Sequence, residues 1–357
     1  MFVCAIACGL PALAISQAHA GPSFDAFKRI LEERGLKNVS SASVEDVDGG
    51  FRVFNLSADQ DGKKVSIKEI IATNAKAMEW GFSADRIVIS EAKQEGNDMG
   101  VAIRQLTLSA LELPYSTSQR SVGLSSAIMT DFVAIDAGLN ALAFDRFMMT
   151  LEPDGKAADV GFKGYVSGTV LSSLVPWALS PVQEDRVPFN GSMKITASDD
   201  QRASLSSEIK LSGYGDYEFS FDLSDVKEQK LDDYNAVFHS YKDVKVASVR
   251  FSMSNMEWLG KALKKHPTND VDGLIDFISN ISGGLVAQIG TIDDGILLKN
   301  SVKAFMEAPS GLTISATPGL KVIDMTGSRE PQSLNLKIVE SLSAGGRKDQ
   351  SPDSVVE

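Results

Sequence analysis

A long run of alternating apolar and polar residues sets the fold class of this chain. From Val39 to about Met253 the apolar residues recur at every second position, and turn-forming residues interrupt them roughly every eight to fifteen positions. Successive side chains of a strand point to opposite faces, so this period predicts antiparallel strands with one face buried and one face wet. We expect a mainly β (α+β) protein built on a long, twisted antiparallel meander sheet.

One hairpin can be read in detail. The turn Asp59-Gln60-Asp61-Gly62 leads into Val65–Ile70, where Val65 and Ile67 face one way and the residues after each of them face the other. The same alternation predicts further strands at Phe51–Leu56, Arg86–Ser90, Val101–Leu113, Asp131–Ile135, Ala141–Leu151, Val160–Val170, Gly191–Ala197, Ala203–Leu211, Tyr217–Leu223 and Lys245–Met253.

No regularly spaced crossover helices separate these segments, which argues against a parallel, doubly wound sheet. The segment Leu171–Val187 breaks the alternation and contains Pro176, Trp177 and Pro181. We expect it to be a loop or a short helix that joins two halves of the sheet.

Helical periodicity marks the start of the chain after residue 20. The segment Phe24–Gly35 has apolar residues at helical spacing, and Gly35 is suited to end it. We expect Ser23 to cap this helix and its apolar stripe to lie on the sheet. The residues of that stripe are Phe24, Phe27, Ile30 and Leu31.

Helices return in the C-terminal third, as an insertion at about 254–307. The candidates are Trp258–Leu263, Asp270–Gln288 and Gly295–Glu307. In the third candidate Ile296, Leu297, Val302 and Phe305 fall near helical spacing, and Asp293 and Asp294 precede it, where acidic residues suit a helix N-terminus. Two strands follow, at Leu312–Ala316 and Leu334–Val339. We therefore expect a single elongated β domain over 21–344 and a disordered tail over 345–357.

The first twenty residues predict an export signal. Residues 1–15 are mostly apolar, and Ala18-His19-Ala20 is the small-x-small pattern that precedes signal-peptidase cleavage. We expect cleavage after residue 20. No Lys or Arg precedes the apolar core, however, so two alternatives stay open: the true start lies upstream of Met1, or the segment is retained as an uncut anchor. Either way we expect the protein in the periplasm, soluble or peripheral, with any membrane contact left undecided.

Composition narrows the chemistry of the exported chain. Both cysteines, Cys4 and Cys8, lie in the signal segment, so cleavage leaves no thiol and only two histidines. The net charge is −12, and Lys and Arg nowhere form a cluster of more than a few residues. Nucleic acid binding requires a concentrated positive patch, so we expect no nucleic acid partner.

The candidate catalytic and metal-binding residues favour ordinary structural roles. His239 and His266 are far apart and lack accompanying thiols, unlike zinc ligands. Ser224 and Lys227 match Ser-x-x-Lys, but no Lys-Thr-Gly follows, and such short matches arise by chance. Gly164–Gly168 does not have the spacing of a nucleophile elbow. We expect no catalytic, cofactor-binding or metal-binding residues, no cofactor and no enzymatic activity.

Two aspartate-rich segments resemble fragments of calcium loops. Asp46–Gly50 and Asp59–Gly62 both lack the full ligand spacing of such loops. An Asp-Gly pair between alternating strands is typical of a tight hairpin turn, so we interpret both segments as turns.

The apolar content exceeds what a small core requires, since 43% of the chain is hydrophobic. One face of so long a sheet must be covered by helices, by a second sheet or by an apolar ligand. The deciding question is whether that face is open or is filled by aromatic residues of the chain itself. The aromatic residues that could fill it are Phe24, Phe27, Trp258, Phe277 and Phe305.

The hairpin units, together with Val249–Leu263 leading to Ala304–Pro318, resemble uncharacterised exported proteins of Gram-negative bacteria in the style of the AsmA-like and YdgA-like envelope proteins. The resemblance covers roughly Val39 to Val339 and rests on loose, mostly structural motifs. It implies a twisted antiparallel sheet that curls into a groove and a role in lipid handling or envelope maintenance. The chain lacks the clear membrane anchor expected for a bridge between membranes.

These observations predict a non-enzymatic periplasmic envelope protein that binds lipid or another apolar ligand in a sheet-lined groove. The alternative is a structural or interaction protein that scaffolds envelope complexes through strand edges or its acidic surface, with an envelope protein as its partner.

Overall fold

The structure is a computed structural model of the chain. It describes residues 21–341 except 48, 97–98, 119, 121, 137–138, 154, 171–184, 199, 227–243, 257, 259–290, 308–310 and 322–333. The predicted signal segment 1–20, the tail 345–357 and the helix Asp270–Gln288 therefore lie outside the described residues. So do most of Leu171–Val187 and all of Trp258–Leu263 except Trp258.

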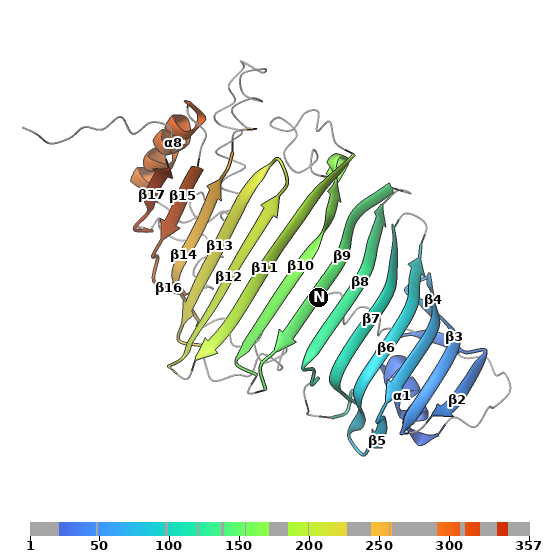
Figure 1. Cartoon of the computed structure of the whole chain (residues 1–357). Helices are drawn as coiled ribbons and strands as arrows, with labels where there is room; N and C mark the ends of the chain where they lie inside the picture. Colours follow the sequence, from blue (N-terminus) through green and yellow to red (C-terminus); the bar gives the residue numbers. More distant parts are fainter. Residues whose placement is uncertain are drawn as a thin grey trace, which may run out of the picture.

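The protein is mainly β, as the alternation predicts, and its described strands form one 17-stranded antiparallel sheet (Figure 1). The strands are β1 Lys37–Ser40, β2 Ser43–Val47, β3 Gly50–Gln60, β4 Lys63–Thr73, β5 Lys76–Met78, β6 Gly81–Glu95, β7 Met99–Pro114, β8 Ser126–Asp136, β9 Leu139–Leu151, β10 Ala157–Ser167, β11 Arg186–Ser198, β12 Arg202–Leu211, β13 Gly215–Ser224, β14 Lys245–Ser254, β15 Gly311–Ala316, β16 Leu320–Lys321 and β17 Lys337–Ser341.

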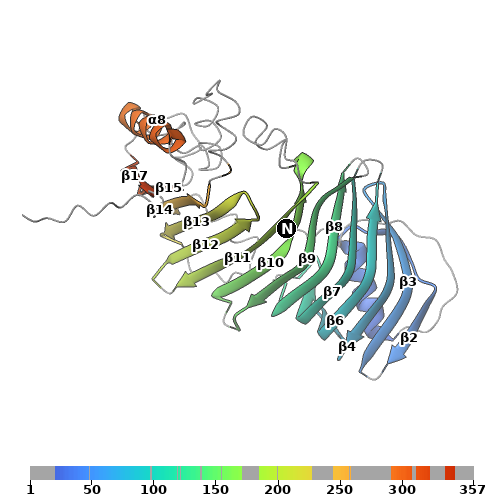
Figure 2. The ribbon, with the colours of Figure 1, turned by 45° about the horizontal axis from the view of Figure 1, so that its top comes forward.

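The strands follow a meander. From β6 to β15 each strand pairs with the next one along the chain, and β17 continues the sheet beside β15. At the other end β1 and β2 both pair with β3. The short strands β5 and β16 pair alongside β6 and β14. Among the described strands the first and last strands of the sheet do not pair with each other, so the sheet is open. The sheet is also twisted, as Figure 2 shows.

One apolar face runs through the whole sheet. Pairing places apolar residues of neighbouring strands directly opposite one another, so the same face is apolar from β3 to β15. One such row is Phe51, Ala72, Ile87, Leu108, Ala127, Met149, Val160 and Met193. A second row is Ile195, Leu205, Phe221, Val249 and Ala316.

The alternation of buried and exposed residues shifts by one position at a line of neighbouring residues in β3, β4, β6, β7 and β8. These residues lie side by side in the sheet, and we call them the slip line. On β3 the buried residues pass from Val53 to Leu56, and Asn55 between them has a φ of 49°. Glu91 on β6 and Asp131 on β8 repeat this left-handed backbone. A left-handed residue reorients the strand locally, so the residues on both sides of it keep the same buried face.

Helix α1, Pro22–Glu33, packs its predicted apolar stripe on the sheet, since all four stripe residues are buried. The capping prediction is wrong. The N-cap is Gly21 and no side chain caps the helix, because Pro22 occupies the first helical position and places Ser23 inside the first turn. Proline has no N–H to satisfy and its fixed φ suits that position.

The C-terminal end of α1 is a Schellman motif. Gly35 has a φ of 89°, and its N–H donates to the carbonyl of Glu32 at 3.0 Å. The N–H of Leu36 donates to the carbonyl of Leu31 at 3.1 Å, and both leucines are buried. This geometry needs a left-handed residue after the cap, which confirms Gly35 as the end of the helix.

Helix α8, Ile292–Glu307, begins earlier than predicted, and only part of its predicted apolar face is buried. Val302 and Phe305 are buried, but Ile296 and Leu297 are 54% and 40% exposed, and the third buried apolar residue is Leu298. The spacing alone could not choose between these faces, because apolar residues occur on both sides of the helix.

Candidate functional site

Two helices cover the two ends of the apolar face. Near the N-terminus, Phe24 and Phe27 of α1 pack on Phe51 and Phe82, both of which are 0% exposed. Near the C-terminus, the buried residues of α8 pack in a second core with residues of β14 and β15. The hydrophobic effect therefore stabilises both ends of the sheet through the chain's own side chains.

The middle of the same face is covered less well. We define the central strip as one residue from each of β9 to β13, and each of these side chains is only half-buried. Their same-face counterparts on β3, β4, β6 and β14, such as Val53, Ile70, Ile87 and Val249, are buried. The residues of the central strip are Met149, Val160, Met193, Leu205 and Phe221.

An aromatic cluster beside this strip extends the N-terminal core along the same face. Phe144 of β9 contacts Phe162 of β10 at a centroid distance of 6.2 Å and Phe189 of β11 at 5.5 Å. Phe144 also contacts Phe132, which belongs to the N-terminal core. Edge-to-face contacts of this kind add to the stability that burial provides.

Glycines make room for these rings. Gly164 pairs with Phe144 on one side and with Phe189 on the other, and Gly191 pairs with Phe162. A Cβ on Gly191 would come within 2.6 Å of the Phe162 ring. The rings thus lie over positions where the neighbouring strand has no side chain, which explains glycines inside strands.

Among the described residues, the aromatic side chains expected to fill the apolar face do so only at its two ends. Phe24, Phe27 and Phe305 do fill its two ends. Trp258 is half-buried against Tyr214, and Phe277 lies outside the described residues. In the described part of the chain, neither helix fills the central strip.

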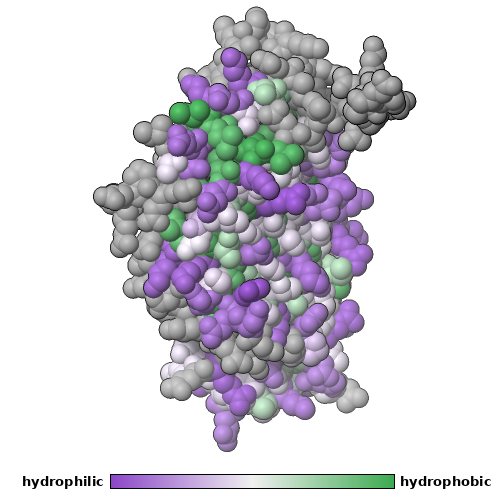
Figure 3. Space-filling view, turned by 90° about the vertical axis from the view of Figure 1, so that its left-hand side faces the viewer, coloured by the Kyte–Doolittle hydropathy of each residue, from purple (hydrophilic) through white to green (hydrophobic). Residues whose placement is uncertain are grey.

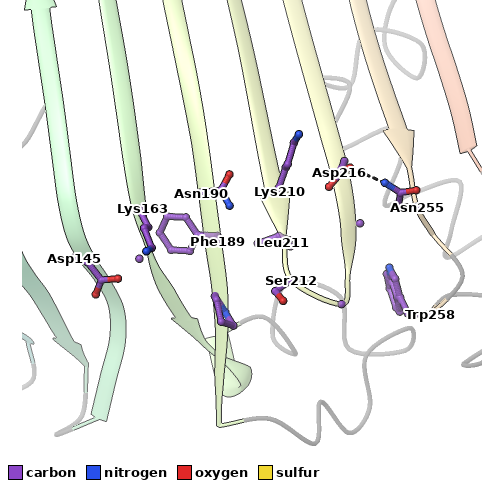
Figure 4. A pocket seen from close by; sticks show the side chains of 14 residues that line it. Asp145, Lys163, Phe189, Asn190, Lys210, Leu211, Ser212, Asp216, Asn255 and Trp258 are labelled. Carbon is purple, nitrogen blue, oxygen red and sulfur yellow. Dashed lines mark hydrogen bonds between the residues drawn. The ribbon is translucent and has the colours of Figure 1, made fainter.

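A separate hollow of about 600 Å³ lies on the polar side of the sheet, towards the β12–β13 turn (Figure 4). A row of four polar residues on neighbouring strands lines it: Lys163, Asn190, Lys210 and Asp216. The apolar Phe189 and Leu211 line it as well. Trp258 stands at one end of this row. We call it the polar hollow.

Hydrogen bonds hold the far end of the polar hollow. Asn255 donates from Nδ2 to Oδ2 of Asp216 at 2.7 Å, and Trp258 donates from Nε1 to the carbonyl of Tyr214 at 2.6 Å. The hydroxyl of Tyr217 donates to the same carbonyl at 2.9 Å. Burial, with a smaller contribution from Asp216, raises the pKa of Tyr217 to about 12, so its hydroxyl stays protonated.

The charge of Lys210 in the hollow is compensated by an acidic neighbour. Lys210 Nζ lies 2.8 Å from Oε1 of Glu208, and that hydrogen bond, with the nearby charges of Glu208 and Asp216, raises the lysine pKa. Lys210 is thus held in its charged form, beside acidic partners.

The structure does not assemble Ser224 into a nucleophilic site within the described residues. Lys227 lies outside them, and the amine opposite Ser224 is Lys245, which pairs with it in the sheet. The hydrogen bond and charge of Asp225, at 2.8 Å from Lys245 Nζ, raise the pKa of this lysine. A lysine held protonated does not accept a proton from a serine hydroxyl.

The aspartate-rich turns fit the hairpin interpretation. Gln60 pairs with Lys63, so Asp61 and Gly62 form a two-residue loop with φ values of 48° and 78°. Val47 pairs with Gly50 in the same way. In the part of the chain that the structure describes, no group of three or more His, Cys, Asp or Glu is placed to hold a metal ion. His239 and His266 lie outside it.

The surface at the β17 edge is mostly hydrophilic, with a hydrophobic patch towards the end where α8 lies (Figure 3). The exposed Ile296 and Leu297 of α8 are apolar residues of that end. Within the described residues, no helix has the length and apolar character needed to cross a membrane.

No family model matches this chain, and neither a curated protein nor a solved structure matches it. The resemblance to the AsmA-like and YdgA-like group therefore stays a prediction.

Proposed function

We propose that the protein is a non-enzymatic envelope protein that binds lipid, or another apolar ligand, on the central strip. The observation that carries this proposal is the contrast in burial along one continuous apolar face. Its ends are buried beneath α1 and α8, whereas Met149, Met193 and Leu205 between them stay half-buried. Among the described residues neither helix lies over this stretch, and a soluble protein rarely leaves an apolar stretch partly exposed without a partner for it.

The chemistry of the strip suits an acyl chain. Four of its five residues are aliphatic or thioether side chains, and Phe221 is aromatic. Methionine is flexible and polarizable, and it adapts to ligands of different shape. The twist of the sheet would let the strip line a shallow groove, as the sequence predicts.

Lipid uptake by the purified protein tests this proposal. Delipidated protein is incubated with palmitate or with phosphatidylglycerol vesicles and re-purified. Native mass spectrometry then measures the mass of the protein with any bound lipid. We expect one or more bound lipids. Delipidated protein that takes up neither probe would contradict the proposal.

A matched pair of variants locates the binding. Leu205→Glu places a charge on the central strip, and Ser206→Glu places the same charge on the next residue of β12, which is exposed on the opposite face. We expect Leu205→Glu to lose most of its bound lipid and Ser206→Glu to keep it, with thermal melts confirming that both fold. Equal retention by the two variants would place the lipid elsewhere.

Export to the periplasm is part of the proposal, supported by the apolar start and by Ala18-His19-Ala20. N-terminal sequencing of the protein from a fractionated Gram-negative host is expected to begin at Gly21 in the periplasmic fraction. An intact N-terminus in the membrane fraction would instead favour the uncut anchor.

The open sheet edge supports the alternative function, a scaffold for an envelope protein. Among the described strands β17 pairs only with β15, and its Val339 is 57% exposed. An edge strand can accept a strand from another protein. Val339→Pro removes a backbone donor there, so it should abolish co-purification of such a partner, whereas Leu205→Glu should not.

A further inference from the structure

The polar hollow lies on the opposite face of the sheet from the central strip. Lys163 and Asn190 line it, and each follows directly after a phenylalanine of the aromatic cluster, Phe162 and Phe189. Successive residues of a strand point to opposite faces. Phe189 itself and Leu211 reach the hollow, but no residue of the central strip lines it, so a ligand of the hollow is distinct from an apolar ligand of the strip.

Strand pairing arranges the polar groups of the hollow in a row. Lys163 pairs with Asn190, Asn190 with Lys210, and Lys210 with Asp216. Neighbouring strands are about 4.8 Å apart, so the row is about 14 Å long. Along it the groups are a donor, an amide that both donates and accepts, a second donor and an acceptor.

The row and its surroundings carry charges of both signs, two lysines and three carboxylates, which argues against a simple ion as the ligand. Lys210 forms an ion pair with Glu208, and the carboxylates of Asp145 and Asp216 also line the hollow. An anion would meet these carboxylates, and a cation would meet two lysines. A neutral ligand that carries many hydroxyl groups can instead donate to the acceptors and accept from the donors.

Trp258 gives the hollow a fixed aromatic side. Its indole is held by the 2.6 Å hydrogen bond to the carbonyl of Tyr214 and by the Tyr214 ring, whose centroid is 5.5 Å away. The side chain is half-buried and lines the hollow, as Figure 4 shows. An aromatic ring held in place offers an apolar surface at little cost in conformational entropy.

From this arrangement we propose that the polar hollow binds a short neutral oligosaccharide, which lies across strands β10 to β13 with one sugar ring against Trp258. Lys163, Asn190, Lys210 and Asp216 form the hydrogen bonds to its hydroxyl groups. This site does not depend on the proposed apolar ligand, and either proposal can fail without the other.

Isothermal titration calorimetry tests the proposal with maltotetraose and tetra-N-acetylchitotetraose as neutral probes. Tetragalacturonate and tetraglucosamine serve as the anionic and cationic counterparts. We expect saturable binding of at least one neutral probe and weaker binding of both charged ones. Asn190→Ala should weaken the neutral probe about tenfold, the loss of one hydrogen bond.

The matched control is Ser192→Ala, which changes an exposed residue of the same strand and the same face outside the hollow. It should bind like the unchanged protein, and Leu205→Glu should do so as well. The proposal is overturned if neither neutral probe binds, if a charged probe binds more tightly than both neutral ones, or if Ser192→Ala weakens binding as much as Asn190→Ala. Because Asn190 is exposed, its truncation should leave thermal stability unchanged.

Discussion

The rings of Phe144 and Phe189 meet edge to face across Gly164, at a centroid distance of 5.5 Å and an interplanar angle of 87°. They belong to β9 and β11, which are separated by β10, and the contact exists because Gly164 between them has no side chain. This contact is a junction between β9 and β11 across the strand that separates them.

A side chain at Gly164 should weaken that junction. A Cβ there would lie 1.9 Å from the carbonyl oxygen of Ala143, so the backbone must move. We expect Gly164→Ala to lower the free energy of unfolding by about 1–3 kcal/mol, measured by urea denaturation. Gly161→Ala on the same strand is the control, because a Cβ there meets nothing within 4 Å, and it should stabilise the protein by about 0.4–1 kcal/mol.

Truncating one phenylalanine at the covered end of the apolar face and one in the central strip should lower stability by different amounts. Phe51 is fully buried beneath α1, so Phe51→Ala should cost about 3–5 kcal/mol. Phe221 in the central strip is half-buried, and Phe221→Ala should cost about 1–2 kcal/mol. Equal losses in thermal or urea denaturation would show that the strip is as well covered as the ends.

The pH dependence of stability should reveal Asp294, which is 7% exposed in α8. Burial raises its pKa, but hydrogen bonds from the N–H and hydroxyl of Thr291 and from the N–H groups of Leu334 and Leu336 outweigh burial and lower the pKa below its usual value. Its contribution to stability is therefore complete above the ordinary aspartate pKa and disappears as the pH falls through the lowered value.

The variant Asp294→Asn should accordingly be less stable than the unchanged protein at neutral pH, by about 1–3 kcal/mol. The difference should shrink as the pH falls below 4, about the usual aspartate pKa, because the unchanged protein then loses the same charge. Urea denaturation at a series of pH values checks this. The neighbouring Asp293→Asn is the control, since Asp293 is exposed.

The slip line across the N-terminal strands should tolerate only certain residues. Asp131 has a φ of 49° and forms an exposed ion pair with Arg104 at 3.2 Å. A β-branched residue is strained in this conformation, so Asp131→Val should cost about 1–2 kcal/mol. Asp131→Gly, which removes the same ion pair without that strain, should cost much less. If both variants lost the same stability, the ion pair would be the cause.

The alternation located most strands correctly, but it missed the short ones. Every strand predicted between Phe51 and Met253 is present, and most are longer than predicted. The strand β5, Lys76–Met78, was not predicted, because all three of its residues are exposed and carry no apolar pattern. Pairing with β6 alone defines it.

The slip line has a signature in the sequence that the period-two reading overlooked. On β4 the buried residues Ile67 and Ile70 are three positions apart, and on β7 the same step separates Ile103 from Leu106. A strict alternation would place the second residue of each pair on the wet face. Aligned steps of three in successive strands could have predicted the line.

The candidate sites depended on information that no single segment contains. Met193, Leu205 and Phe221 look like any other inward-facing strand residues, and only the absence of a described helix above them distinguishes them from Phe51. The row Lys163, Asn190 and Lys210 is scattered over almost fifty residues of the sequence and forms only through strand register.

The sequence by itself determined the class of this protein, because a side-chain period of two is a local property of the chain and needs no knowledge of its neighbours. It also determined where α1 ends, since only a residue such as Gly35 adopts that backbone without strain. The tertiary structure alone decided which part of the apolar face each helix covers and which polar residues stand side by side. Those outcomes depend on contacts between segments far apart in the chain, whose free energies no local pattern contains.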